Sequence, residues 1–501
     1  MKINRDYVLL ALIFCFVLGF RLFFALRTPN FTDSTSYFNL RQIEHIKQTA
    51  LPLYQDDLSY SGRFLVFLPF FHYLLAISSF FLPIWVVGKL MPAIFASCLV
   101  LITYLISFEI TKSKESSLFT ALVSGFIPIF IDETINTVSE YTLVIPLTLT
   151  VIYFLMKVRD DKRSVPLFLV SMFFLAITHQ TVFVLVISLL FYLVLIRLED
   201  LSHSKAETEL ILFSSFFVTW LGFVLFKRAF SLYGPAVVWQ NIPLTIMAQH
   251  FKDLNVLEAI YKIGIIPFVF GFYMIYKTVF IEKDRRLYLL ISFALTVFIL
   301  VWLRLIRLDL GLVYLSIFLT LLFSPFYKTL IIYIKKTRFS KNKGWFVVLL
   351  LLIFVLTAFL PCVGYANAAI ARAFGEEEIK AFEWARDKTK EDGVVLATLE
   401  EGHLVTAIAQ RKNVVDNNFL MQQNVDQRLN DAKTIYTTMF ETEAIRLLTK
   451  YGVDYILFSE RARKEYKIEQ LSYVGDEKCF RLVYNNSIKI YQSLCEIEVG
   501  G

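Results

Sequence analysis

Cysteine is scarce in this chain, with five among 501 residues, which is too few for a scaffold held together by disulfides. Cys479 and Cys495 can pair if the C-terminal tail lies outside the cell, although two thiols in a tail usually stay free. The sequence also lacks internal repeats and low-complexity segments. Because many transporters are built from internal repeats, their lack counts against transport as the function.

Long apolar runs, in contrast, dominate the sequence. It is 57% hydrophobic, contains 50 phenylalanines and has a mean hydropathy of +0.60. Such runs predict transmembrane helices, because about 20 residues cross the hydrocarbon core of a bilayer. The first run ends at Arg27-Thr28-Pro29 without a small-residue cleavage site, so we expect an uncleaved anchor. The predicted fold class is a polytopic α-helical membrane protein of about 11 spans. The spans are expected near 7–26, 84–108, 117–132, 140–156, 165–178, 180–197, 210–227, 259–277, 287–303, 310–325 and 344–361.

Basic connections set the expected orientation in a plasma membrane. With these spans, every connection rich in Lys and Arg falls on one side, which is therefore cytoplasmic together with the N-terminus. These connections are Lys2/Arg5, Lys112/Lys114, 157–163, 197–205, 277–286 and 328–343. The pattern holds only if the apolar segment 64–82 does not cross, and Pro69 and His72 in its middle fit a re-entrant or surface-lying hairpin. We therefore expect 27–83 to form one long outer loop. The net charge of +7 is explained by these loops, so we expect no nucleic-acid partner.

The chain changes character after Pro361. Residues 371–501 hold most of the acidic residues and alternate helical and strand-like patterns. Helices are predicted over 376–390 and 431–450, and short buried strands over 394–399, 413–416, 455–458 and 488–491. We predict a transmembrane domain over 1–370 and a small extracytoplasmic α/β domain over 371–501.

Polar groups capable of chemistry gather at the expected outer face. They are Asp33 with Tyr37 and Arg41, then Asp132, Glu133 and Glu140, then His179, and finally Arg304 and Arg307. Acids can hold a divalent cation or act as a base, and two arginines on one helical face suit a phosphate. This combination fits transfer from a phosphate-linked lipid, in which metal and arginine stabilise the leaving phosphate while a carboxylate orients the nucleophile.

Each group also has a structural explanation. Asp33 is a good helix N-cap residue, and Asp132-Glu133 fits an ordinary hydrophilic turn. The two arginines fit snorkelling interface anchors, and a histidine in an apolar run such as His179 is commonly structural. The functional prediction therefore depends on their shared face, since chance would scatter them to both sides.

The sequence resembles the GT-C class of integral-membrane glycosyltransferases, and most the catalytic subunit of archaeal and bacterial oligosaccharyltransferases. The run Asp33-Ser-Thr-Ser-Tyr37-Phe38-Asn-Leu-Arg41 is similar to the first-loop aspartate motif of that family. Gly88-Lys-Leu-Met-Pro92 and then Pro128 before Asp132-Glu133 follow its second and third spans and second acidic motif, for which Ser139-Glu140 is the other match. Phe382-Glu-Trp384-Ala-Arg, Gly402-His403 and Arg411-Lys-Asn-Val-Val-Asp416 resemble the opening of its outer domain.

The resemblance implies roles for these residues. Asp33 is the expected catalytic carboxylate, as base or as metal ligand. The metal, Mg²⁺ or Mn²⁺, would be held by Asp33, Asp132, Glu133 and Glu140, and a metal-independent mechanism stays open. The residues expected to bind donor phosphate are Arg304 and Arg307, which match the family's late membrane arginines, with help from Arg41 or His179.

One departure bears on the acceptor. Oligosaccharyltransferases carry a Trp-Trp-Asp-Tyr-Gly motif that reads the acceptor sequon, whereas this chain has Thr398-Leu-Glu400-Glu401-Gly402-His403. Glu400, Glu401 and His403 are therefore the acceptor-side candidates. We expect transfer of a sugar from a polyprenyl (dolichyl-type) phosphate or diphosphate donor, within membrane lipid, to a protein or glycan acceptor on the outer face. The alternatives are oligosaccharyl transfer to protein Asn, a lipid or glycan transporter or flippase, and a noncatalytic subunit.

Overall fold

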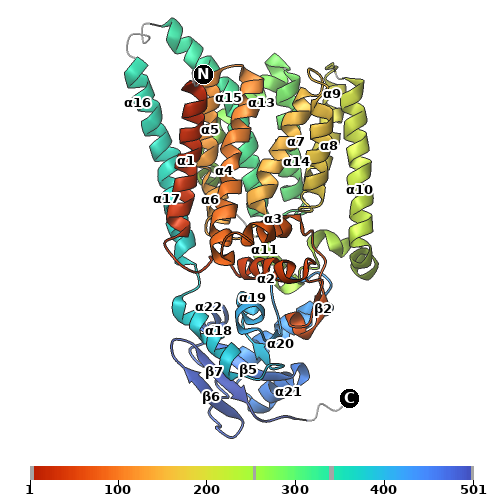
Figure 1. Cartoon of the computed structure of the whole chain (residues 1–501), viewed down its shortest axis with the longest axis vertical. Coiled ribbons are helices and arrows are strands. Elements are labelled where there is room, and N and C mark those ends of the chain that lie inside the picture. The colour runs from red at the N-terminus through yellow and green to blue at the C-terminus, as the bar shows by residue number, and fades with distance from the viewer. Residues whose placement is uncertain (1–4, 203, 252–254, 338–342, 498–501) are drawn as a thin grey trace.

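Long helices form a bundle, and a smaller region containing a β-sheet lies at one end of it (Figure 1). The computed structural model describes residues 5–202, 204–251, 255–337 and 343–497. Lys2 and part of the expected basic connection 328–343 lie outside the described residues. The start of the first helix and the sheet-containing region lie at opposite ends of the molecule.

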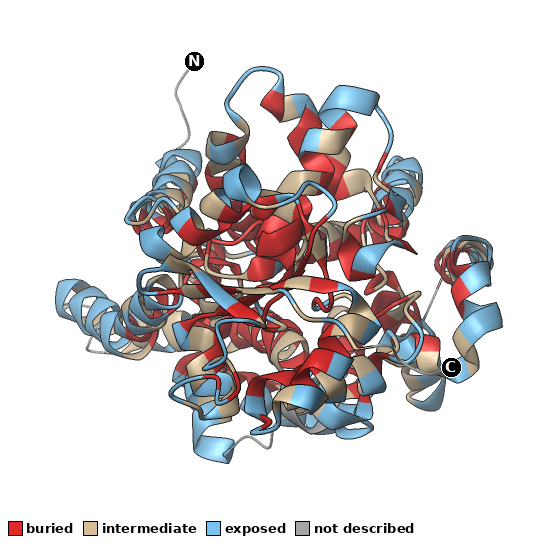
Figure 2. Cartoon of the chain, turned by 90° about the horizontal axis from the view of Figure 1, so that it is seen from below, coloured by how far each residue is buried: buried red, intermediate tan, exposed pale blue. Residues whose placement is uncertain are grey.

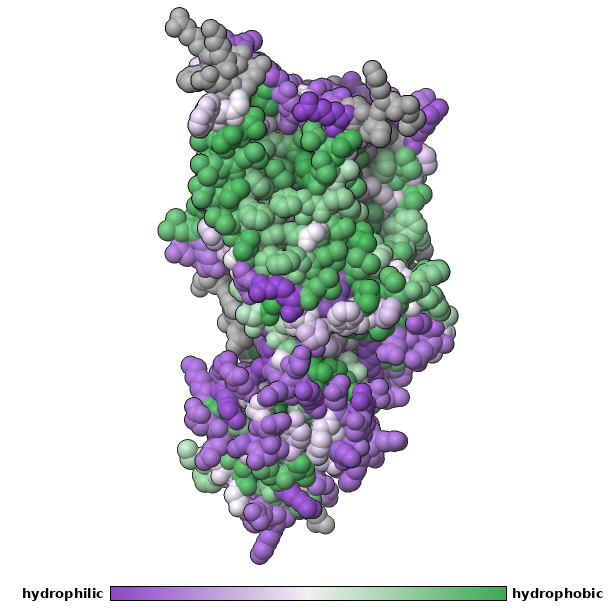
Figure 3. All heavy atoms as spheres, turned by 60° about the vertical axis from the view of Figure 1, so that its left-hand side comes forward, coloured by the Kyte–Doolittle hydropathy of each residue, from purple (hydrophilic) through white to green (hydrophobic). Residues whose placement is uncertain are grey.

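The bundle contains helices of membrane-crossing length. Within the described residues, seven helices are long and apolar enough to cross a membrane, or eight if one bent pair counts as a single span. The long ones are built from α1 (Arg5–Ala25), α4 (Ile84–Thr111), α10 (Lys205–Tyr233), α13 (Ile265–Lys277), α14 (Arg285–Trp302), α15 (Leu308–Lys336), and α16 (Lys343–Phe354) with α17 (Leu360–Ala371). The bent pair is α5 (Lys114–Gly125) with α6 (Pro128–Thr134), which meet at 45°. Figure 3 shows the resulting apolar belt, bounded by hydrophilic surface above and below.

Shorter apolar helices complete the bundle as α7 (Tyr141–Lys157), α8 (Ser164–Ala176) and α9 (Val182–Leu198). The apolar run 165–197 is therefore two helices, and His179 lies in the break between them, as predicted. The polytopic helical fold class expected from the sequence is confirmed.

The predicted outer loop contains two further helices, α2 (Ser34–Thr49) and α3 (Phe70–Ser79), at the end of the bundle that faces the sheet-containing region (Figure 1). The apolar helix α3 has 10 residues, about half the length that crosses a bilayer. This length agrees with the prediction that segment 64–82 does not span the membrane. The position of α2 and α3 places the first loop between the bundle and the sheet.

The C-terminal region contains a five-stranded sheet of order β4-β3-β5-β7-β6. Its strands are β3 (Val394–Leu396), β4 (Lys412–Asn413), β5 (Val453–Phe458), β6 (Phe480–Asn485) and β7 (Lys489–Ser493). The first three are mutually parallel, and β7 and β6 continue the sheet antiparallel. The sequence missed β6, because only Phe480 in it is buried and its apolar pattern is weak. A disulfide joins Cys479 to Cys495, so the pairing considered from the sequence is present.

Helices flank the sheet as α18 (Glu376–Lys388), α20 (Val425–Thr437), α21 (Glu441–Tyr451) and α22 (Glu460–Tyr466). The single helix predicted over 431–450 is wrong, since the chain breaks between α20 and α21. The Thr438 hydroxyl donates to Glu443 Oε2 at 2.6 Å and accepts from the backbone N–H of Phe440, which satisfies the new helix start. Seen from below, buried residues occupy the centre of the molecule and exposed ones its rim (Figure 2).

Candidate functional site

Asp33 lies directly before α2, at its N-cap position and in an extended conformation. Its carboxylate accepts a hydrogen bond from the Ser36 hydroxyl, and Ser36 Oγ in turn accepts the backbone N–H of Val138 at 2.8 Å. This chain of contacts ties the first loop to the loop between α6 and α7. Burial raises the pKa of Asp33, while the bond from Ser36 and the charge of Arg307 act to lower it.

Arg307 is the cation whose charge acts on Asp33. It precedes α15 (Leu308–Lys336), is exposed, and acts electrostatically on Tyr141, Glu133, Asp309 and Asp33. Its contact with Asp309, at 4.0 Å, is a loose one. The charge of Arg307 therefore acts on both Asp33 and Glu133.

Arg304 is placed differently. Helix α14 ends at Trp302, and the backbone N–H groups of Arg304 and Leu305 bond back to carbonyls of that helix. The backbone of Arg304 has a left-handed conformation, with φ of 55°, and the residue is exposed in the turn before α15. The expectation that Arg304 and Arg307 share one helical face is therefore wrong, because the spacing of three spans a helix break.

Glu140 lies between two histidines at the start of α7. His72 Nε2 is 3.7 Å from Glu140 Oε1, and His179 Nε2 is 3.7 Å from Glu140 Oε2. Burial raises the pKa of Glu140 to about 8 and lowers the pKa of His72 to about 3 and that of His179 to about 4. Burial therefore favours the neutral form of all three groups.

His72 was not among the predicted site residues. It lies in α3, is fully buried, and its Nε2 is 2.9 Å from Asn39 Oδ1. Asn39 Nδ2 donates to the carbonyl of Val138 at 2.6 Å, which fixes the amide oxygen as the acceptor for His72. The only signal in the sequence was a histidine inside an apolar segment, in a chain with 6 histidines.

The remaining acids and Arg41 have structural partners. Asp132 accepts from Arg372 at 2.6 Å, which draws it toward the end of α17 (Leu360–Ala371). Arg41 makes a bidentate pair with the buried Asp56, with both contacts at 2.8 Å. The guanidinium of Arg41 therefore stabilises the first loop and is not left free to bind a phosphate beside Arg307.

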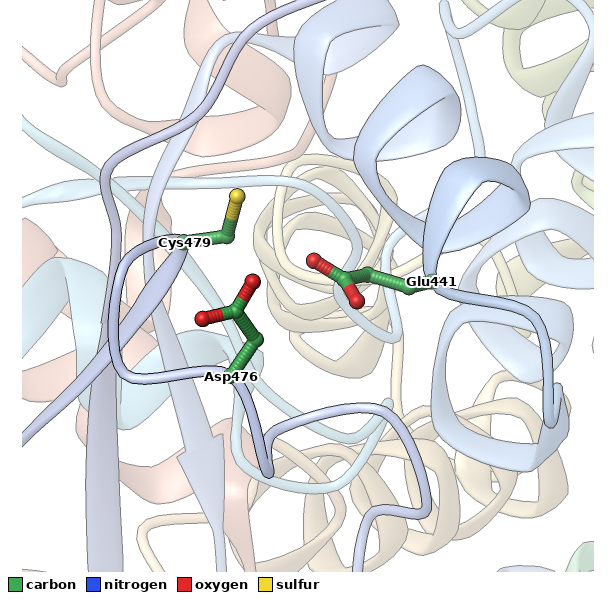
Figure 4. A group of neighbouring side chains, drawn as sticks. All are labelled: Glu441, Asp476 and Cys479. Carbon is green, nitrogen blue, oxygen red and sulfur yellow. The ribbon is translucent and has the colours of Figure 1, made fainter.

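One trio of side chains has metal-ligand spacing. Among the described residues, Glu441, Asp476 and Cys479 are the group whose ligand atoms all lie within 4.8 Å of one another (Figure 4). This acidic group lies in the C-terminal region, apart from the four predicted acids. Cys479 is bonded to Cys495, so its sulfur is no thiolate ligand in this state and two carboxylates remain. The metal role of Asp33, Asp132, Glu133 and Glu140 stays a prediction.

The acceptor-side candidates face in different directions. Glu400 is exposed and pairs with Arg461 at 3.3 Å. Glu401 is fully buried and accepts from the backbone N–H and the hydroxyl of Thr398, at 3.2 and 2.8 Å. His403 is buried against Phe38 of α2, with ring centroids 5.3 Å apart. Glu400 alone of the three is open to a ligand from solvent.

The sequence matches no family profile and no curated protein, so similarity to known proteins is found only at the level of structure. AglB from Archaeoglobus fulgidus, solved with an inhibitory peptide and a dolichol-phosphate, matches with a TM-score of 0.67 and 13% identity over 89% of this chain and 69% of that one. An oligosaccharyltransferase of the same archaeon, solved with Zn and sulfate, matches with a TM-score of 0.63 and 15% identity over 93% of this chain and 71% of that one. ArnT from Cupriavidus metallidurans bound to undecaprenyl phosphate gives 0.58 and 13%, over 97% of both chains. At these identities the likeness establishes the fold, and this chain has the GT-C-like fold of membrane glycosyltransferases.

Proposed function

We propose that this protein is a GT-C-type glycosyltransferase that uses a polyprenyl-phosphate or polyprenyl-diphosphate sugar and acts at the outer face of the membrane. The observation that carries the proposal is the electrostatic proximity of Asp33 and Arg307 at one end of the bundle. The fold supports it, and so do neighbours of that fold solved with dolichol-phosphate and undecaprenyl phosphate.

Asp33 and Arg307 have complementary roles in this proposal. The bond between the sugar's anomeric carbon and the phosphate oxygen breaks, and a bond from that carbon to the acceptor forms. Arg307 stabilises the phosphate that leaves, and Asp33 takes the proton from the acceptor. A phosphate bound to Arg307 also offsets the positive charge that lowers the pKa of Asp33, so donor binding makes Asp33 a better base.

Glu140 and His179 are the residues we propose for a divalent cation. Once Glu140 is ionised, they offer a carboxylate oxygen and an imidazole nitrogen 3.7 Å apart, whereas the carboxylate of Asp132 is paired with Arg372. The Nδ1 atom of His179 is 3.1 Å from Thr181 Oγ1, a contact that can orient the ring for binding through Nε2. A bound cation would stabilise negative charge on the donor phosphate. A carboxylate and an imidazole suit Zn²⁺ or Mn²⁺ better than Mg²⁺.

Two versions of the proposal differ in the acceptor that receives the sugar. Transfer to a protein Asn is the second candidate, because an oligosaccharyltransferase solved with a peptide, AglB, matches 89% of this chain. The sequence Thr398-Leu-Glu400-Glu401-Gly402-His403 lacks the tryptophans and aspartate of the sequon-reading motif, so we favour a different acceptor.

The test uses the full chain in lipid nanodiscs with radiolabelled polyprenyl-phosphate and diphosphate sugars, with and without Mn²⁺ and Zn²⁺. Wild-type turnover that is lost in Asp33→Asn and Arg307→Ala, and largely kept in Arg304→Ala, is the expected result. Adding a sequon peptide or a glycan as acceptor decides between the two versions. Turnover that survives Asp33→Asn, or no binding of any donor, would overturn the proposal.

A further inference from the structure

A small cavity lies between the outer ends of α1 and α4 and the loop that follows α6. Arg21 of α1, Lys89 of α4, and Asn136 and Thr137 of the loop are among its lining residues. It has room for about one water-sized particle. None of the groups proposed for glycosyl transfer lines it.

Two buried basic residues, Arg21 and Lys89, line this cavity without a carboxylate beside them. Arg21 and Lys89 are 2% and 3% exposed, and no Asp or Glu of the described chain lies within 4.0 Å of either one. Arg21 Nη1 donates to Thr134 Oγ1 at 2.9 Å, and its guanidinium lies 4.8 Å from the Phe130 ring centroid. These contacts bond and pack the guanidinium but leave its charge without a counter-charge, which is costly inside a protein.

Unpartnered polar atoms point to the same place. The Nε atom of Arg21 and the Oγ1 atom of Thr137 are buried, and neither has a hydrogen-bond partner within the described chain. Both residues line the cavity and are more than nine-tenths buried. Because buried polar groups are nearly always paired, two orphaned donors at one cavity indicate a ligand that accepts hydrogen bonds.

The charge and size of the cavity select the ligand. A water molecule would satisfy the donors but would leave the positive charge of Arg21 without a counter-charge, and a phosphate group exceeds the space. We propose that this cavity binds one small monovalent anion, chloride, which accepts hydrogen bonds from Arg21 Nε and Thr137 Oγ1.

The cavity connects to the segment that carries Asp33. Lys89 Nζ donates to the carbonyls of Thr28 and Asn30 at 3.1 and 3.0 Å. Asn136 Nδ2 donates to the Asn30 carbonyl and to Thr32 Oγ1, both at 3.0 Å. Residues at the cavity therefore hold the stretch immediately before Asp33, so anion binding stabilises the fold and this segment together.

The test measures thermal unfolding of the full chain in nanodiscs by tryptophan fluorescence. Sodium chloride, bromide and gluconate are compared at constant ionic strength, because gluconate is too large for the cavity. We expect a saturable rise in Tm with chloride and bromide only. Thr137→Val removes one donor at nearly constant shape, and the halide concentration at half effect should rise about tenfold. The matched control is Thr150→Val, a threonine of α7 whose hydroxyl bonds to the Pro146 carbonyl.

Direct detection comes from anomalous scattering of bromide-soaked crystals, with a peak expected between Arg21 and Thr137. Equal Tm in halide and gluconate, an unchanged halide response in Thr137→Val, or stabilisation by phosphate alone would overturn the proposal. Arg21→Lys keeps the charge and loses Nε, so a folded Arg21→Lys protein with the wild-type response would overturn it too. These readouts need no glycosyl transfer, so they stand or fall separately from the proposed function.

Discussion

Two buried or partly buried acids of this molecule, Asp416 of the C-terminal region and Asp33 of the first loop, differ in how fully they are paired. Asp416 accepts from Ser59 at 2.6 Å, from Asn413 at 3.1 Å and from Arg63 at 3.1 Å. Burial alone would raise its pKa, but these partners, Arg63 above all, hold the pKa below its usual value. Asp33 has Ser36 and a more distant Arg307, and burial keeps its pKa raised.

The difference separates an acid that holds the fold from one that is free to react. A fully paired acid has no capacity left for a substrate, whereas an underpaired acid in a polar neighbourhood is a typical functional group. Glu140 belongs with Asp33, since the ionisable groups nearest to it are two histidines at 3.7 Å and burial raises its pKa to about 8.

Asp33→Asn should break activity and leave stability nearly intact. We expect a loss of about 10²- to 10⁴-fold in turnover, the range for removing a group that transfers a proton. Donor turnover and Tm, measured on the same nanodisc sample, check this. A large drop in Tm with parallel loss of activity would assign Asp33 to the fold instead.

Asp416→Asn should show the opposite pattern, since it leaves the guanidinium of Arg63 buried without its charge partner. Breaking such a pair costs about 3–5 kcal/mol of unfolding free energy. Denaturant unfolding checks the loss, and turnover per folded molecule should stay near wild type. Glu400→Gln, at an exposed pair with Arg461, is the control and should change stability little. An unchanged unfolding midpoint in Asp416→Asn would remove the contrast with Asp33.

Arg307→Ala should sharpen the comparison within the site. We expect about 10- to 100-fold lower kcat/KM for the lipid-phosphate donor, because the group that stabilises the leaving phosphate is lost. Arg304→Ala removes an arginine three residues away that is not among the charges acting on Asp33. Equal losses in both variants would show that general positive charge, rather than Arg307, binds the donor.

Part of the site was predictable because it depends on local sequence. Asp33 stands next to an apolar span and before a helix, and both features are visible in the sequence. The partners of His72 were not visible, since Asn39 and Glu140 reach it from other segments of the chain.

The roles of the arginines depend on contacts that spacing does not reveal. Arg41 fits a phosphate ligand by residue type, but folding of the first loop pairs it with Asp56. Arg304 and Arg307 are spaced for one helical face only if the helix continues, and the left-handed turn at Arg304 ends it. The fold class was predictable because long apolar runs need no knowledge of distant partners.

The pH dependence of stability is the smallest expected effect and tests Glu140 as an underpaired acid. Its folded pKa of about 8 lies above the ordinary glutamate value of 4.5, so the folded state binds the extra proton between these values. Stability from Glu140 therefore falls as the pH rises from 4.5 to 8. His72 and His179 have lowered pKa values, so their contribution falls as the pH drops below 6.5.

Of these three groups, only Glu140 changes its contribution to stability between pH 6.5 and 8. The contribution of Glu140 to Tm should decrease across this window, and Glu140→Gln should remove that part of the pH dependence because glutamine cannot titrate. Glu400→Gln, at the exposed pair with Arg461, is the comparison and should keep the wild-type slope. A wild-type slope retained in Glu140→Gln would show that Glu140 is already ionised at pH 7, which would place it with Asp416 as a paired structural acid.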